Sequence, residues 1–398
     1  MKFIENILDK HRDRFEKGGD LAKWKPLFEA ADTILFWTNE RTKINPHVRD
    51  SLDLKRFMMM VIVALVPSTL FGIYNVGYQH FYALGQQPEL WNSFLFGLMK
   101  FLPIAIVSYA VGGFWEVLFS IIRKHEVNEG FLVTGILFPL ILPPTIPLWQ
   151  VAVAVSFGVV IGKEVFGGTG MNVLNPALTA RAFVFFAYPG KISGDKVWTA
   201  IDTAKDKVID TFSGATPLLV ASNTEAGGQA VQSLHNFQYG DFGFINLFMG
   251  FIPGSIGETS ALAALIGAVI LIITRVGSWR IIVSVFAGGY LTAMLMNVLA
   301  GTESTGMFTL PPYYHLVMGG FAFGAVFMAT DPVSAAQTNT GKWFYGLLIG
   351  ALAILVRVVN PAYPEGMMLA ILFMNVFSPL IDYYVVKGNI KRRLKRAA

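Results

Sequence analysis

Long apolar segments alternate with shorter polar segments from about residue 57 to residue 386. Many apolar segments approach the roughly 20 residues that a helix needs to cross the hydrocarbon core of a bilayer. We therefore predict an all-α polytopic membrane protein with ten transmembrane helices. Their approximate ranges are 57–76, 94–122, 130–142, 148–162, 173–187, 260–274, 281–300, 315–330, 343–359 and 366–386.

The polar segments divide the predicted helices into two blocks of five. A cytoplasmic N-terminal segment, an outer loop and a basic cytoplasmic tail complete the expected organisation. The predicted boundaries are 1–54 for the N-terminal segment, 55–187 for the first five-helix repeat, 188–258 for the outer (periplasmic) loop, 259–386 for the second five-helix repeat and 387–398 for the tail.

Lysine and arginine predict which side of the membrane each loop occupies. Basic residues flank alternate loops, with Lys163 marking a cytoplasmic loop after the fourth predicted helix, and the tail from Lys387 to Arg396 is strongly basic. Because positively charged loops stay in the cytoplasm, we expect both termini inside and the loop 188–258 outside. That loop carries four lysines, but long loops follow the charge rule only weakly.

The two blocks contain short matching patterns in the same order. Gly135-x-x-Phe138-x4-Pro143 matches Gly324-x-x-Phe327-x4-Pro332, Gly158-x-x-Ile161-Gly162 matches Gly346-x-x-Ile349-Gly350, and Val173-Leu-Asn175-Pro176-Ala177 matches Val358-Val-Asn360-Pro361-Ala362. Because each block has an odd number of helices, the second copy must insert upside down, which gives two inverted five-helix repeats. The Asn-Pro pairs predict broken helices between the halves. Chance similarity among glycine-rich apolar segments is the alternative.

Composition supports the membrane assignment and excludes several classes of function. The chain is 54% hydrophobic and 14% charged, with a mean hydropathy of +0.53, whereas soluble domains carry about 25% charged residues. The net charge of +5 comes from basic residues at the termini and in short loops, so nucleic-acid binding is not expected. Without cysteine, the chain is expected to hold no disulfide and no iron–sulfur cluster. We predict no tightly bound metal.

A polar motif, Asp210-Thr-Phe-Ser213-Gly214-Ala215-Thr216, lies in the long loop. Alone, Ser-Gly-Ala-Thr-Pro is typical of a small-residue turn. The motif also resembles the signature at which flavin transferases esterify FMN to a threonine. That resemblance makes Thr216 the expected site of covalent FMN attachment, and Asp210, Ser213, Gly214 and Ala215 the flavinylation motif. Small residues would leave the threonine hydroxyl accessible to the transferase.

Further motifs along the whole chain resemble one family. They are Val111-Gly-Gly-Phe-Trp-Glu116, Arg123-Lys-His-Glu-Val-Asn-Glu-Gly130, Lys163-Glu-Val-Phe-Gly-Gly-Thr-Gly170, Ile252-Pro-Gly-Ser-Ile-Gly-Glu258, Met328-Ala-Thr-Asp-Pro-Val-Ser334 and Asn360-Pro-Ala-Tyr-Pro-Glu-Gly-Met-Met368. They are similar to the B subunits of the bacterial sodium-pumping NADH:quinone oxidoreductases. The paralogous D subunits of the Rnf ferredoxin:NAD oxidoreductases share the fold and the flavin threonine. Thr211 departs from the pattern, since many flavin-attachment motifs have glycine there.

The resemblance implies a translocase subunit in the bacterial inner membrane. It would pass electrons from covalent FMN through non-covalent riboflavin to ubiquinone, its quinone substrate, and couple this to Na⁺ translocation. Expected partners are other subunits that carry flavin and iron–sulfur groups, a flavin transferase during maturation, and membrane lipid. The chain has no Gly-x-Gly-x-x-Gly after a strand, so NADH is expected to bind a partner. The alternatives are an Rnf-type D subunit and a passive small-solute channel or transporter of the same fold.

Two residue pairs are candidates for the remaining ligands. Asn172 and Asn175 follow a glycine-rich bend, where their side chains could cap helix ends or bind the edge of a flavin ring. The resemblance makes them the candidates for riboflavin binding. Gly112 and Gly113 could serve close helix packing, and the resemblance places the quinone site beside them.

Three carboxylates, Glu116, Asp331 and Asp382, lie in or beside apolar spans. A carboxylate at the centre of a membrane helix costs about 2.5–3.5 kcal/mol, and carboxylate oxygens suit a hard cation such as sodium. We predict that these three acids line a sodium path. The alternatives are that Glu116 pairs with Arg123, that Asp382 pairs with Lys387, and that Asp331 caps a helix.

Overall fold

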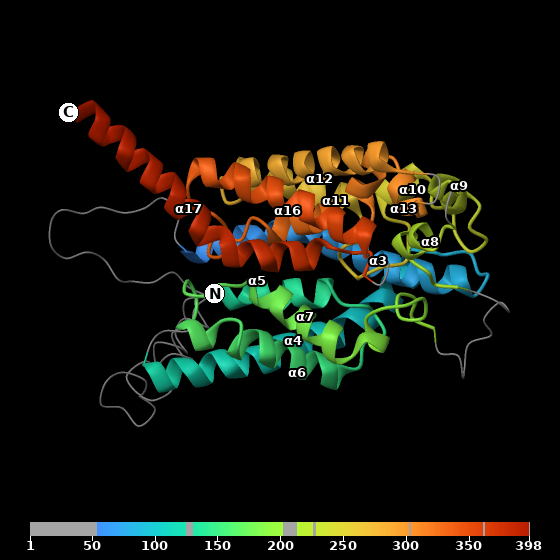
Figure 1. The fold of residues 1–398 in the computed structure, drawn as a ribbon. Coiled ribbons are helices and arrows are strands. Elements are labelled where there is room, and N and C mark those ends of the chain that lie inside the picture. Colours follow the sequence, from blue (N-terminus) through green and yellow to red (C-terminus); the bar gives the residue numbers. More distant parts are fainter. Residues whose placement is uncertain are drawn as a thin grey trace, which may run out of the picture.

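The computed structural model describes residues 54–124, 130–201, 213–225, 228–301, 304–360 and 363–397. Within these ranges every regular element is a helix (Figure 1). The all-α class predicted from the hydrophobic pattern is confirmed for this part of the chain.

Six stretches of the described chain are long and apolar enough to cross a membrane. Five are single helices, and the sixth is α6 extended by the short 3-10 helix η2, Glu164–Phe166. Their bounds are α3 Leu54–Ala83, α4 Leu90–Arg123, α6 Leu148–Val160, α12 Trp279–Leu299, α16 Asn339–Val359 and α17 Met367–Ala397. Each coincides with a predicted span, and α17 also includes most of the predicted tail.

Three predicted spans are helices too short to cross a bilayer alone. They are α5, Gly130–Leu140, α7, Pro176–Ala187, and α11, Ala261–Ile273, with 11, 12 and 13 residues. At 1.5 Å per residue they reach about 16–20 Å, against a hydrocarbon core of about 30 Å. The length of the helices therefore supports six crossings in the described chain, and the count of ten remains a prediction.

The predicted span over 315–330 is not one continuous helix. The helix α14, Pro312–Val317, ends before Met318, and α15, Phe321–Phe323, leads into the π-helix η4, Gly324–Met328. The break falls at Gly319, whose φ of +62° suits a residue without Cβ. Hydropathy alone does not register this break, because the residues on both sides are apolar.

The ends of two short helices meet inside the bundle. The N–H of Gly257 donates to the carbonyl of Leu140 at 2.7 Å, and the N–H of Ile256 donates to that of Leu142 at 3.1 Å. These bonds join the end of α5 to the segment before α11. Non-helical backbone at membrane depth is tolerated only where protein or a water-filled cavity satisfies it, and these bonds satisfy part of it.

Side-chain caps fix where two of the broken helices begin. The Asn175 side chain accepts hydrogen bonds from the N–H groups of Ala177 and Leu178 at the start of α7. Ser260 accepts one from Ala263 at the start of α11. The Asn-Pro pair at 175–176 therefore marks a helix start, as the pattern predicted.

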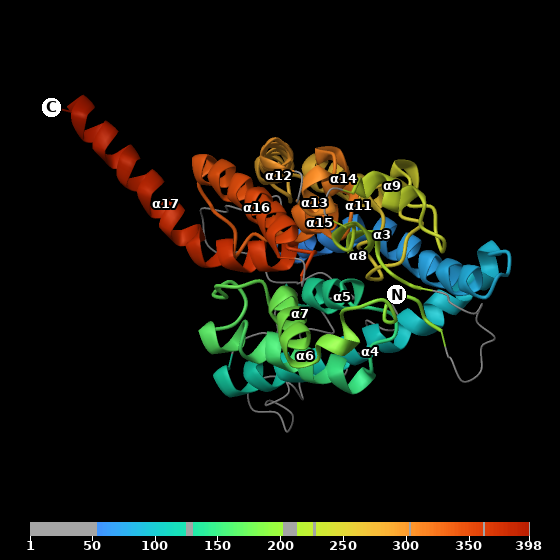
Figure 2. The ribbon, with the colours of Figure 1, turned by 45° about the vertical axis from the view of Figure 1, so that its right-hand side comes forward.

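The described helices form two groups (Figures 1 and 2). One contains α4 to α7, and the other contains α11, α12, α16 and the first part of α17. Helix α3 packs against both α4 and α11, so it connects the two groups. In the first group α4 packs along α6, and in the second α12 packs along α16, which is the pairing that equivalent helices of a repeat would make.

The repeated glycines nevertheless serve different contacts in the two groups. A Cβ on Gly158 would lie 2.7 Å from Ala180 Cβ on α7, whereas a Cβ on Gly346 would lie 2.0 Å from Ser284 Oγ on α12. The matching glycines on α6 and α16 therefore pack against helices that do not occupy equivalent positions in the two groups. The inverted repeat remains a prediction.

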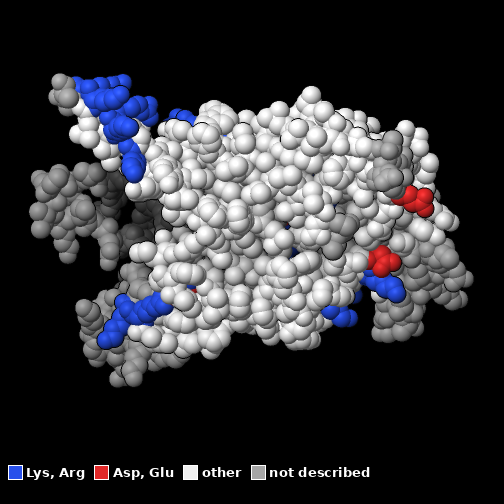
Figure 3. All heavy atoms as spheres, in the orientation of Figure 1, with Lys and Arg blue, Asp and Glu red and all other residues white. Residues whose placement is uncertain are grey.

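The two ends of the bundle differ in structure and charge. The short helices α8, Pro217–Ser222, α9, Ala230–His235, and α10, Phe244–Met249, lie at one end, and the C-terminal part of α17 projects from the other (Figure 1). On the face in Figure 3, many basic side chains gather where α17 projects, and the visible acidic ones lie at the opposite end. Two further short helices, η3 Pro189–Lys191 and α13 Gly306–Thr309, complete the regular elements of the described ranges.

Candidate functional site

Thr216 lies at the wall of a cavity of about 910 Å³, which we call the Thr216 cavity. Its polar lining includes Arg181, Glu258, Tyr363 and Glu365. The cavity therefore brings the predicted attachment threonine together with charged residues from three distant parts of the chain.

Local structure fixes the position of the Thr216 side chain. Thr216 is the N-cap of α8, where its hydroxyl oxygen accepts a hydrogen bond from the N–H of Leu219 at 3.3 Å. Pro217 follows at the first helical position, where its missing N–H is not needed. The side chain is half-buried, so its hydroxyl lies at the junction of the loop and the cavity.

The small residues before Thr216 pack into the loop. A Cβ on Gly214 would lie 2.7 Å from the carbonyl oxygen of Asp195 and 3.0 Å from Thr199 Oγ1, and Ala215 is buried. Gly214 thus allows close approach of two loop segments, in addition to any role in transferase access. Ser213 is half-buried, and Asp210 lies outside the described residues.

A buried ion pair forms one wall of the Thr216 cavity. Arg181, on α7, donates from Nη1 to Glu258 Oε1 at 2.8 Å, and Nη2 lies 3.4 Å from Ser255 Oγ. Both charged side chains are less than 10% exposed. Glu258 lies in the loop before α11. The pair places a fixed cation beside the cavity.

Tyr363 contributes a polar group without a partner. Its side chain is 8% exposed and lines the Thr216 cavity, and its hydroxyl has no hydrogen-bond partner among the described residues. Leaving a buried polar group unsatisfied costs about 1–3 kcal/mol. Glu365 is already engaged, since it accepts from the N–H of Gly320 at 2.8 Å. The cavity therefore offers a ligand at least one unused hydrogen-bonding group.

A second cavity, of about 710 Å³, brings three of the predicted residues together. We call it the Lys163 cavity, and it is lined by Lys163, Thr169, Asn172, Asn175 and Asp331 among others. The hydroxyl of Thr169 is buried without a partner in the described structure. Asn172 and Asp331, 159 residues apart in sequence (331 − 172), thus face one space.

The two cavities lie toward opposite ends of α3. Phe57 and Met58, at the start of α3, line the Lys163 cavity. Near the other end of α3, His80 Nδ1 lies 2.7 Å from the carbonyl oxygen of Ala200, in the loop that packs against Gly214. The helix rises about 35 Å between residues 57 and 80. The two candidate ligand sites are therefore separated along the bundle axis.

The asparagines already make local hydrogen bonds. Asn172 Nδ2 donates to the carbonyl of Leu174 at 3.0 Å, and Asn175 Oδ1 caps α7. The capping alternative is therefore correct for Asn175. Its place on the cavity wall leaves riboflavin binding as a prediction that rests on the resemblance.

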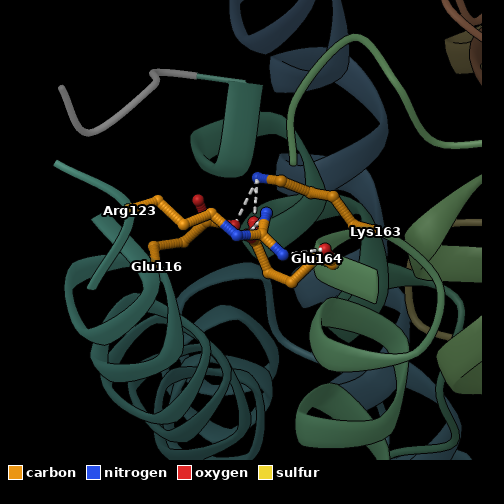
Figure 4. Close-up of polar contacts among 4 residues, drawn as sticks. All are labelled: Glu116, Arg123, Lys163 and Glu164. Atoms are coloured by element: carbon orange, nitrogen blue, oxygen red, sulfur yellow. Dashed lines mark hydrogen bonds and ion pairs between the residues drawn. The ribbon is translucent and has the colours of Figure 1, made fainter. Parts of the chain in front are cut away.

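Glu116 pairs with a lysine, and the suggested pairing with Arg123 is wrong (Figure 4). Glu116, on α4, is 3% exposed and accepts a hydrogen bond from Nζ of Lys163, which is 4% exposed. Arg123 pairs with Glu164 instead, at 3.1 Å from Nη1 to Oε2. The lysine that marked a cytoplasmic loop in the sequence is thus a buried charge.

Asp382 and Asp331 both accept hydrogen bonds from backbone N–H groups near helix starts and turns. Asp382, on α17, accepts from the N–H groups of Gln337 and Thr338 at 2.6 and 3.0 Å, just before α16. Asp331 accepts from the N–H of Ser334 at 3.1 Å. Asp331 thus binds within a turn at which no described helix begins, and Asp382 binds the backbone just before α16, whose N-cap is Thr338. Within the described residues no ion pair joins Asp382 to Lys387.

The two glycines of α4 differ in their surroundings. A Cβ on Gly112 would lie 2.3 Å from the ring of Phe131 on α5, so Gly112 serves helix packing. A Cβ on Gly113 would come no closer than 3.9 Å to the same ring. Only Gly113 of the pair leaves room for a ligand at its own position.

Comparison with known proteins gives the family of this chain. The sequence matches the family described as NQR2, RnfD, RnfE over residues 41–391. The chain belongs to the NQR2, RnfD, RnfE family. A protein of Ectopseudomonas mendocina (strain ymp), named as the B subunit of Na(+)-translocating NADH-quinone reductase, is 52% identical over 99% of both chains. A protein of the same name from Chromohalobacter salexigens is 53% identical, over 99% of this chain and 97% of its own.

Membership of the NQR2, RnfD, RnfE family confirms the resemblance drawn from the motifs. Four residues of the two cavities nevertheless received no role from the sequence. Arg181 lies within an apolar span, where a charged residue is a functional candidate by default, so a signal was present. Lys163 served only as a topology marker, and Glu258 and Tyr363 appeared only within family motifs.

Proposed function

We propose that this chain is the membrane subunit of a redox-driven sodium pump that reduces quinone. The proposal rests chiefly on the identity of 52% over 99% of both chains with a protein named as the B subunit of Na(+)-translocating NADH-quinone reductase. The similarity covers almost the full length of both chains and is not confined to one part of them. NADH oxidation would belong to other subunits of the complex.

We place covalent FMN on Thr216, with its ring in the Thr216 cavity. The residues present fit such a group. The Tyr363 hydroxyl is buried without a partner among the described residues, and Arg181 brings a cation to the lining of the same cavity. When bound, FMN would supply one- and two-electron transfer. Arg181 would hold a positive charge beside it, and Tyr363 would donate a hydrogen bond.

The Lys163 cavity is our candidate for the non-covalent riboflavin. Thr169 brings an unpartnered buried hydroxyl to it, and Asn172 and Asn175 bring amides. Such groups can hydrogen-bond the edge of a flavin ring. The quinone site is proposed beside Gly113, since the space at Gly112 is filled by Phe131.

Sodium would be the transported substrate, and Glu116, Asp331 and Asp382 are proposed to line its path. Two of them, Glu116 and Asp331, lie at the Lys163 side of the bundle: Asp331 lines the Lys163 cavity, and Glu116 binds the lysine that also lines it. Carboxylate oxygens suit a hard cation. Each acid has a structural partner, so sodium would have to replace or share these contacts.

The proposed setting is the bacterial inner membrane, with both termini in the cytoplasm and the end with α8 to α10 outside. Two inverted five-helix repeats would then meet around the broken helices. Proposed partners are the other subunits of the complex, a flavin transferase, ubiquinone and lipid. The relatives named above favour the sodium-pumping reductase over an Rnf-type D subunit or a passive channel.

The decisive test of this function is the covalent flavin. Thr216→Ala removes the hydroxyl that we propose is esterified, so the denatured subunit should lose its flavin fluorescence on a gel. Thr224→Ala, just beyond the same short helix, is the matched control and should keep full fluorescence. An undiminished signal from Thr216→Ala in membrane-inserted protein would place the flavin elsewhere.

A further inference from the structure

Four charged side chains meet at the inner end of α4 (Figure 4). Lys163 Nζ contacts Glu116 Oε1 and lies 3.8 Å from Glu164 Oε1. Arg123 holds the other oxygen of Glu164 and, through Nη2, its backbone carbonyl at 2.5 Å. When all four are ionised the cluster is neutral, with Arg123 assigned to Glu164 and Lys163 to Glu116.

The two basic residues differ in exposure. Arg123 is 31% exposed, whereas Lys163, Glu116 and Glu164 are each less than 5% exposed. A buried carboxylate needs a compensating charge, since removal of one partner of such a pair leaves an unpaired charge and costs several kcal/mol. Lys163 supplies that charge for Glu116 from inside the protein.

Lys163 also belongs to the Lys163 cavity, together with Asp331. Lys163 therefore contacts a carboxylate of the cluster and also lines a cavity whose wall includes a second carboxylate. A lysine carries a compact charge on a flexible four-carbon chain, unlike the planar and rigid fork of arginine. The residue is thus suited to change partners without movement of the backbone.

We propose that Lys163 is a built-in cation that competes with transported sodium for the Glu116 carboxylate. When sodium binds Glu116, the ammonium group leaves it for the side of the cavity where Asp331 lies, and it returns when sodium departs. Lys163 thus contributes its positive charge to Glu116 when sodium is absent, and sodium contributes it when sodium is bound. This inference rests on the proposed sodium transport.

The test is a sodium titration of quinone reduction by the purified complex. Lys163→Gln removes the competitor, so the half-saturating sodium concentration should fall by about fivefold or more, the usual lower range of coupling between two ligands. Lys163→Arg keeps a cation and adds a second donor to the carboxylate, so the half-saturating concentration should rise. Opposite shifts in the two variants are the signature of competition.

Lys124→Gln is the matched control. Lys124 is exposed beside the cluster and, in the described part of the chain, forms no ion pair with Glu116 or Glu164, so its removal takes away one nearby positive charge and half-saturation by sodium should stay close to that of the parent. Thermal unfolding provides a readout that does not depend on turnover. Sodium chloride should raise the melting temperature of Lys163→Gln more than choline chloride does, by a larger margin than in the parent, because a ligand that binds the folded state stabilises it.

Two failures can be told apart. A parent complex whose quinone reduction ignores sodium would overturn the proposed function itself. A parent that responds to sodium, with both Lys163 variants following the parent's titration and melting behaviour, would leave Lys163 with a structural role only. If Lys163→Gln does not assemble, the direction of the shift in Lys163→Arg decides, because only competition predicts a higher sodium requirement.

Discussion

Arg181 and Glu258 are buried charges that pair across the wall of the Thr216 cavity, at 2.8 Å. Arg181 comes from α7 and Glu258 from the loop before α11, so the pair fastens two short helices to one another. An ion pair removed from water gains Coulomb energy only if its geometry is good and other polar groups are satisfied. Ser255 provides such a contact to Arg181, at 3.4 Å.

Removal of one member of this pair should destabilise the protein strongly. Arg181→Leu leaves the Glu258 carboxylate buried without its cation, which costs about 3–5 kcal/mol. We expect a marked fall in the melting temperature of the purified complex. The double variant Arg181→Leu, Glu258→Leu removes both charges and should recover most of the loss. A single variant that melts like the parent would contradict the structural importance of the pair.

The site residues show where the reasoning from sequence stopped. Thr216 could be proposed as the attachment site because the motif around it is contiguous in a polar loop, and that assignment stays a prediction. Asn172 and Asp331 line the same cavity. This could not be predicted from the sequence, because it depends on how distant helices pack. Lys163 follows the charge rule for a cytoplasmic loop, so its sequence context gave no reason to expect a buried partner.

At the scale of helices, the positions of the helices could be predicted from the sequence more accurately than their lengths. The long helices α3, α4, α12 and α16 are found where apolar segments predicted them. The short helices α5, α7 and α11 were predicted at the right places but as full spans. Hydropathy measures whether a segment avoids water, and a buried half-helix avoids it as well as a full crossing does. The contact of Gly257 with Leu140, which ends α5 against the segment before α11, is invisible to it.

The neighbouring glycines of α4 provide a test of packing against ligand binding. Gly112→Ala would bring its Cβ within 2.3 Å of the Phe131 ring, and such overpacking costs about 1–3 kcal/mol. The melting temperature of the complex should therefore fall. Gly113→Ala has 3.9 Å of space, so its stability should hold while the KM for quinone rises, if quinone lies there. An unaltered KM for quinone in Gly113→Ala would contradict a quinone site beside Gly113 on α4.

The two ends of the molecule differ both in their charged side chains and in their loops. Basic side chains gather where α17 leaves the bundle, and the short helices of the long loop lie at the other end (Figures 1 and 3). Because basic segments are retained in the cytoplasm, this arrangement would place the Thr216 cavity outside and the C-terminal end of α17 inside. Electrons would then arrive at the outer end and sodium contacts would begin near the inner end.

Cysteine labelling in intact cells tests this orientation. The chain has no cysteine, so each introduced thiol reports alone within this protein. Asn223 is exposed at the end of α8, and Gly388 is exposed on the projecting part of α17 with no heavy atom within 4 Å of an added Cβ. Both positions should accept a cysteine without disturbing the fold.

An impermeant thiol reagent should label Asn223→Cys in intact cells and leave Gly388→Cys unlabelled. After the membrane is permeabilised, both should react, which controls for thiols that are inaccessible for local reasons. The contrast follows from charge, since moving the basic end of α17 across the bilayer would require transfer of several cations through the hydrocarbon core at a cost of a few kcal/mol each. The reverse labelling pattern would show that the protein has the opposite orientation in the membrane. Thr216, the proposed attachment site, would then face the cytoplasm, and the proposed direction of electron flow would be wrong.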